Sequence, residues 1–165
     1  MGYVAAVTTP TTDQVSRAGR TLVAGVLLGL GTVAFIDETV FHQLLHWHHF
    51  YDRSTTDVGL VSDGLFHAFS WFATVAALFL LAQLRRDRAL HVRRFVGGLL
   101  VGAGAFQLYD GLVQHKLLGL HQIRYDVALL PYDLVWNITA GVLLIVGAAL
   151  VLTTRTRQAR LPPSP

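Results

Sequence analysis

Four long apolar segments constrain the fold of this chain more than any other feature. They cover residues 21–45, 61–84, 95–118 and 131–152, and each exceeds the roughly 20 residues that a helix needs to cross the hydrocarbon core of a bilayer. The chain is 53% hydrophobic and only 14% charged, a composition poor in charge for a soluble domain. We therefore predict a single all-α membrane domain over residues 1–165, an integral membrane four-helix bundle in which every helix spans the bilayer.

The basic residues predict how the four helices are oriented. Ten of the thirteen lie on one side of the predicted spans: Arg17, Arg20, Arg85, Arg86, Arg88, Arg93, Arg94, Arg155, Arg157 and Arg160. Short loops rich in Lys and Arg stay in the cytoplasm, so both termini are expected there and the histidine-rich loops outside. The charges form short clusters between apolar blocks and no continuous patch with aromatic residues, so we predict no nucleic-acid partner.

An internal repeat predicts that the bundle consists of two helical hairpins, at about residues 21–84 and 95–152. A shift of 73 residues aligns Gly25 with Gly98, Gly29 with Gly102, Asp37 with Asp110, His42 with His115 and His48 with His121, and a shift of 70 aligns Asp63 with Asp133 and His67 with Asn137. Two parallel copies are expected to be related by an axis along the membrane normal. Small residues four apart let helix backbones meet closely in lipid, so the first and third helices are expected to cross at the four aligned glycines.

Ionisable side chains gather in the outward-facing half of the predicted bundle, which contains seven of the eight histidines and eight of the ten acidic residues. A charge at the centre of a bilayer costs roughly 2.5–3.5 kcal/mol, so these side chains are expected to face the bundle interior and to satisfy one another or hold an ion. Helical spacing groups them: Glu38, His42, His46 and His49 share one face of the first helix, Asp63 and His67 stand one turn apart on the second, and Asp110 and His115, five residues apart, flank a face of the third without being stacked.

Four-helix bundles hold metals with carboxylates and histidines on facing helices. We predict a transition-metal site near the outer face, with these ligands: Asp37, Glu38, His42, His46, His49, Asp63, His67, Asp110, His115 and His121. The chain has no cysteine and its only methionine is Met1, which leaves imidazole, carboxylate, amide and backbone oxygen as ligands. Imidazole and carboxylate together favour iron, zinc, copper or manganese. The sequence does not decide whether Asp133 and Asn137 are metal ligands or only form contacts between helices. The sequence also does not decide whether His48 and His49 bind the metal or belong to an aromatic belt at the membrane interface.

Several functions are compatible with such a site. It would serve a membrane oxidoreductase that acts on a lipid-soluble substrate, or a hydrolase that uses a metal-bound water. A b-type haem with His42 and His115 as axial ligands is an alternative, although it leaves the carboxylates unexplained. A metallochaperone is another, whereas a translocating channel is disfavoured because the inner halves of the spans are apolar. If no metal or cofactor is bound, the polar residues are expected to form a closed hydrogen-bond network that only holds the helices together.

Three stretches carry a resemblance to a known family: GLGTVAFIDETVFHQLLHWHH (29–49), DGLFHAFSW (63–71) and YDGLVQHKLLGLHQIR (109–124). The chain resembles an uncharacterised family of predicted bacterial four-helix membrane proteins, known only as a domain of unknown function. The resemblance implies a protein of the bacterial inner membrane and implies no activity. The resemblance also implies a link to terminal oxidase assembly, which is compatible with copper or haem handling, a metallochaperone or a structural subunit of a respiratory complex. A homo-oligomer is the other candidate assembly.

Overall fold

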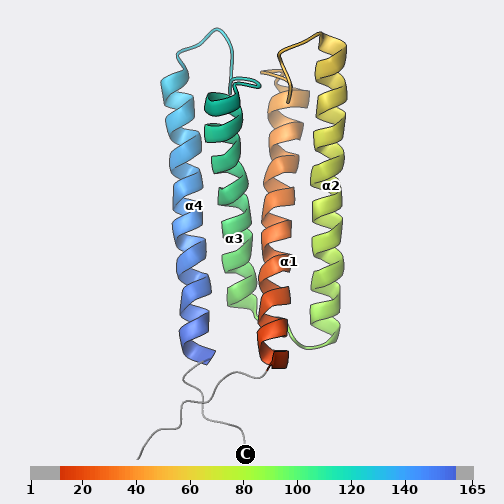
Figure 1. Cartoon of the computed structure of the whole chain (residues 1–165), viewed down its shortest axis with the longest axis vertical. Coiled ribbons are helices and arrows are strands. Elements are labelled where there is room, and N and C mark those ends of the chain that lie inside the picture. The colour runs from red at the N-terminus through yellow and green to blue at the C-terminus, as the bar shows by residue number, and fades with distance from the viewer. Residues whose placement is uncertain (1–11, 159–165) are drawn as a thin grey trace, which may run out of the picture.

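The computed structural model describes residues 12–158, and within them the chain is all-α with no strand. Its elements are the α-helices α1 (Thr12–Asp37), α2 (Thr56–Arg86), α3 (Val92–Tyr109) and α4 (Leu129–Gln158) and the π-helices η1 (Glu38–Leu44) and η2 (Asp110–Leu118), which continue α1 and α3 (Figure 1). Residues 1–11 and 159–165, which include Arg160, lie outside the described residues.

All four helices are long and apolar enough to cross a membrane, which confirms the predicted number of spans. The candidate spans are Ser16–Leu44, Thr56–Arg86, Val92–Leu118 and Leu129–Thr154. The second begins five residues earlier than predicted, because Thr55 caps α2 by accepting a hydrogen bond from the backbone N–H of Val58 at 3.4 Å. Mean hydropathy is lowest in the third span, at 1.3. This is the span with the largest buried share and the least lipid contact.

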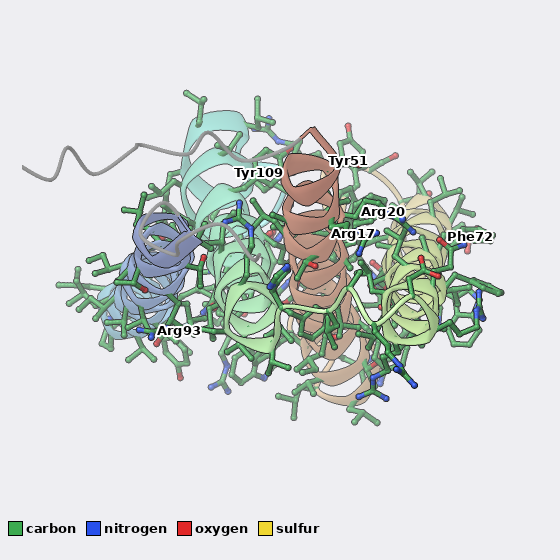
Figure 2. The ribbon with its side chains drawn as sticks, turned by 90° about the horizontal axis from the view of Figure 1, so that it is seen from below. Arg17, Arg20, Tyr51, Phe72, Arg93 and Tyr109 are labelled. Atoms are coloured by element: carbon green, nitrogen blue, oxygen red, sulfur yellow. The ribbon has the colours of Figure 1, made fainter. Side chains whose placement is uncertain are left out.

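The helices lie side by side in the order α4, α3, α1, α2 (Figure 1). Figure 2 shows the same order in a view from below, roughly down the helix axes. α1 and α3 pack against each other at the centre, α2 packs against α1, and α4 packs against α3. The outer helices therefore bury narrow faces and leave large apolar side chains such as Leu65, Phe72 and Ile145 exposed. In a bilayer these faces are solvated by lipid. Each outer helix packs against the central helix of its own hairpin, as expected for two helical hairpins. The internal repeat between the two hairpins stays a prediction.

The contact between α1 and α3 depends on glycine. A Cβ atom added to Gly25, Gly29, Gly98 or Gly102 would lie closer than 3.0 Å to backbone atoms of the opposite helix. Gly29, for example, would collide with the carbonyl group of Leu99, and Gly102 with that of Val26. Without side chains at these positions the two backbones touch over two helical turns. Van der Waals contact of this kind holds helices together in lipid, where the hydrophobic effect between them is missing.

The two ends of the molecule differ in chemistry. The lower end in Figure 1, here called the basic end, carries Arg17, Arg20 and Arg93, which Figure 2 labels in a view from below. The opposite end, here called the histidine-rich end, is formed by η1, η2 and the loops at residues 45–55 and 119–128. Between them lie two small apolar clusters, one around Ala24 and Leu84 and one of Ala34, Phe66 and Phe106. The second cluster supports the polar groups at the histidine-rich end.

Candidate metal centre

Both central helices change from α-helix to π-helix where their acidic residues begin. η1 starts at Glu38, directly after Asp37, and η2 starts at Asp110. Hydrogen bonds in a π-helix join residues five apart, so side chains five apart come close together. Asp110 Oδ2 lies 3.1 Å from His115 Nε2, and Asp37 Oδ2 lies 3.9 Å from His42 Nε2. The expectation that Asp110 and His115 only flank a face was wrong, because it assumed α-helical geometry.

Carboxylates hold His42 on one side of its ring. Its Nδ1 lies 3.0 Å from Asp63 Oδ1 and 3.0 Å from Glu38 Oε2. Asp63 also contacts His49 Nδ1, at 2.6 Å from its Oδ2, and accepts a hydrogen bond from the backbone N–H of Phe50 at 2.7 Å. His42 Nε2, on the other side of the ring, is buried and has no hydrogen-bond partner. Asp63 therefore fixes the orientation of His42 from α2.

His48 and His121 are held by two reciprocal hydrogen bonds between the halves of the chain. His48 Nδ1 donates to the carbonyl oxygen of Ile123 at 3.0 Å, and His121 Nδ1 donates to that of Phe50 at 2.9 Å. Phe50 and Ile123 are related by the same 73-residue shift as the two histidines. The rings stack, with centroids 4.5 Å apart and planes at 8°. A carbonyl oxygen can only accept, so both Nδ1 atoms carry the proton and both Nε2 atoms offer a lone pair.

Asp110 joins the side chains of the second half. Its Oδ1 accepts a hydrogen bond from Gln114 Nε2 at 3.0 Å and lies 3.6 Å from His121 Nε2. His115 Nε2 lies 3.0 Å from His121 Nε2, so two ring nitrogens face each other beside a carboxylate. His115 Nδ1 is buried without a hydrogen-bond partner. This geometry places nitrogen and oxygen donors within reach of one another in a buried site.

Three sets of side chains bring donor atoms within 4.8 Å of one another: His48, His115 and His121; Asp37, His42 and His48; Glu38, His42 and Asp63. All are buried, and His42 and His48 each belong to two of the sets. We call these residues, together with Asp110 and His49, the histidine–carboxylate cluster. Both halves of the chain contribute an Asp-x4-His-x5-His series to it, at Asp37 and at Asp110.

Two of the predicted ligands do not reach the cluster. His67 is exposed, and its ring packs on Phe35 with centroids 5.3 Å apart. The reason is that α2 packs mainly against α1 and buries only a narrow face. This face includes Asp63 and Phe66 but not His67. His46 follows the end of η1, has a positive φ of 50° and is exposed. Helical spacing does not apply to it, because the helix has already ended.

Sequence reasoning left out Gln114 and did not decide on His48. Gln114 is buried and contacts Asp110, but it has no glutamine counterpart at the 73-residue shift, so no signal identified it. For His48 the alignment with His121 was the signal. Asp133, also left open, makes an ion pair with Lys116 Nζ at 2.6 Å, and its carbonyl accepts a hydrogen bond from Asn137 Nδ2 at 2.8 Å.

A polar cavity of about 410 Å³ leads from the loops of the histidine-rich end to His48. His46, Trp47, His49, Asp52 and Tyr125 complete its lining. Burial and the neighbouring Asp52 carboxylate raise the pKa of Tyr125. His48 therefore borders both the histidine–carboxylate cluster and this cavity.

His48 stays neutral across the ordinary pH range. Burial, together with the imidazoles of His121, His42 and His115, lowers its pKa from 6.5 to about 2. The unfolded chain takes up this proton below pH 6.5 and the folded protein does not, so His48 makes the free energy of unfolding fall as the pH drops below 6.5. We expect a contribution of about 1.4 kcal/mol per pH unit. Denaturant unfolding of metal-free protein in detergent at pH 7 and pH 5 measures it. An equally steep decline in the His48→Gln variant would show that another group is responsible.

A family model described as Predicted membrane protein (DUF2243) matches the chain over residues 24–154. The matched segment includes every residue of the histidine–carboxylate cluster. A search of curated proteins and a search of solved structures each find no match. Because the family model covers well over half of the 165 residues, the chain belongs to the DUF2243 family of membrane proteins.

Proposed function

We propose that this protein is an integral membrane metalloprotein that binds a transition metal through His42, His48, His115 and His121 and the carboxylates of Asp37 and Asp110. The observation that carries the proposal is the reciprocal hydrogen-bonding of His48 and His121. Metal-ligating histidines almost always donate their other ring N–H to a carbonyl or carboxylate, which fixes the tautomer and the ring orientation. Asp63 holds His42 in the same manner.

Unpaired donor atoms support the same conclusion. His42 Nε2, His48 Nε2 and His115 Nδ1 are all buried and lack hydrogen-bond partners. A buried polar atom without a partner costs about 1–3 kcal/mol, and a buried carboxylate costs more unless it is paired or coordinates a metal. A cation bound among these atoms would satisfy several of them together. A network that only tied the helices together would have no need to leave them unpaired.

The donor set narrows the chemistry. Four imidazoles and several carboxylates suit iron, copper, zinc or manganese. The sets that share His48 have room for one ion or for two neighbouring ions. The haem alternative has less support, because the rings of His48 and His121 lie within 4.4–6.1 Å of His42 and His115 and occupy the region between them. A porphyrin between His42 and His115 would need that space.

Elemental analysis and an absorbance spectrum of the detergent-purified protein test the proposal. We expect at least one equivalent of iron, copper, zinc or manganese per chain, and the His115→Ala variant should lose most of it. His67→Ala is the matched control, because it removes an exposed histidine from a membrane-spanning helix outside the cluster. A wild-type protein that is still free of metal after incubation with each ion would refute the proposal, and a Soret band would establish haem in its place.

A further inference from the structure

An apolar pocket lies on the lipid-exposed side of the histidine–carboxylate cluster. Its volume is about 500 Å³, and residues of α1, α2, α3 and η2 line it. Aromatic rings dominate the lining: Phe50, Phe66, Phe69, Phe106 and Tyr109. Pockets of 300–1,000 Å³ lined by apolar side chains with a few polar groups are typical binding sites for small molecules.

The pocket is accessible from the bilayer. Leu65, Phe69 and Tyr109 lie at its rim and are 70%, 51% and 50% exposed. Tyr109 is the last residue of α3 before η2 and is labelled in Figure 2. In a membrane these side chains face lipid, so a lipid-soluble molecule can reach the pocket without passing through water.

The inner wall of the pocket touches the cluster in three places. The Phe50 carbonyl accepts the hydrogen bond from His121 Nδ1. The Phe66 ring lies 5.7 Å from the ring of His42. Gln114 lines the pocket and donates to Asp110. A molecule in the pocket would therefore lie next to the proposed metal ligands.

Gln114 shows what kind of group the pocket would bind. The residue is 1% exposed, and its Oε1 has no hydrogen-bond partner. Of the other polar side chains in the lining, Tyr109 lies at the exposed rim. Ser62 already donates its hydroxyl proton to the carbonyl of Gly59 at 2.6 Å and accepts a hydrogen bond from the backbone N–H of Tyr51 at 3.0 Å. At the buried wall of the pocket, Gln114 Oε1 is therefore the open acceptor, and a matching ligand must bring a donor to it. An acyl chain of a lipid has none.

The arrangement of the rings favours a flat ligand. Phe50 stacks on Phe66 with centroids 4.9 Å apart, and Phe66 stacks on Phe106 with centroids 5.8 Å apart and planes at 15°. A further aromatic ring can extend such a series by offset stacking. We propose that the pocket binds a membrane-soluble hydroquinone, with its ring against these phenylalanines and a hydroxyl group donated to Gln114 Oε1. This inference rests on the proposed function, for which it supplies a substrate class.

The test compares two ligands of nearly the same shape, 2,3,5-trimethylhydroquinone and its dimethyl ether, which lacks the hydroxyl donors. Binding to the full chain in lipid nanodiscs is measured by calorimetry under nitrogen. We expect the hydroquinone to bind about five- to tenfold more tightly, the effect of one hydrogen bond. Ala105→Phe should weaken hydroquinone binding at least tenfold, because Ala105 lines the pocket and is exposed away from the cluster. Ala76→Phe, at an exposed position of α2 outside the pocket, is the matched control.

Metal content is measured on the same samples, and Ala105→Phe should leave it unchanged. Equal affinity for the two compounds, or hydroquinone binding that Ala105→Phe leaves intact, would overturn the hydroquinone proposal. Neither result would contradict the proposed metal site. Hydroquinone binding that depends on Ala105 in a wild-type protein that holds no metal would support the pocket while refuting the proposed function. The two proposals therefore fail separately.

Discussion

Replacing His48 with alanine is expected to reduce the metal bound to the purified protein to less than about a tenth, a larger loss than substitution of His115 or His121 causes. His48 belongs to two of the three donor sets, whereas His115 and His121 belong to one, and it is the residue that joins His115 and His121 to Asp37 and His42. Substituting groups that only orient a ligand lowers metal affinity about 10- to 100-fold, and losing a shared ligand should cost more. Elemental analysis per mole of protein, followed by chelator competition, measures the loss.

His46→Ala is the matched control for this prediction. His46 lies two residues from His48 and lines the same polar cavity, but it is exposed and belongs to none of the donor sets. We expect the variant to keep its full metal content. If the two variants lost metal to the same extent, the loss would come from the loop as a whole and His48 would not be a ligand. Elution as a single species by size exclusion checks that both variants fold.

The Gly29→Ala substitution is expected to lower the free energy of unfolding by about 3 kcal/mol or more, at the upper end of the cost of overpacking. The added Cβ would collide with the carbonyl group of Leu99. Backbone cannot rotate away as a side chain does, so α1 and α3 must move apart. Because both halves contribute to the cluster, the reciprocal bonds of His48 and His121 should weaken as well.

Gly141→Ala provides the comparison, since a Cβ at Gly141 meets no atom within 4 Å. Alanine in an open helical position is neutral or stabilises by up to about 1 kcal/mol. Thermal unfolding of both variants in the same detergent, followed by helical circular dichroism, measures the difference. Equal stability of the two variants would mean that α1 and α3 do not depend on close backbone contact.

The sequence was sufficient to predict the four spans, because hydropathy alone determines which segments can enter a bilayer. It also identified most of the histidine–carboxylate cluster, because ionisable side chains are costly in lipid wherever they do not meet each other. The alignment of Asp37 with Asp110 and of His42 with His115 predicted that these four side chains act together. These inferences need only composition and order along the chain.

Three features were beyond such reasoning. Hydropathy does not distinguish an α-helix from a π-helix, so the contact between Asp110 and His115 could not be foreseen from their spacing. The spacing that groups Glu38, His42 and His46 does not reveal that the helix ends at Leu44. The face of α2 that is buried depends on which helices surround it, and α2 packs mainly against α1. His67 consequently lies outside the cluster, although it is one turn from Asp63.

The reciprocal bonds between the halves also set an order of events during synthesis. The carbonyl partner of His48 lies 75 residues further along the chain, and the His121 ring that stacks on it comes 73 residues later. A nascent chain in which only the first hairpin has entered the membrane holds His42 and His48 without these partners. The site therefore becomes complete only when the ribosome has translated past Ile123 and the third helix has been inserted.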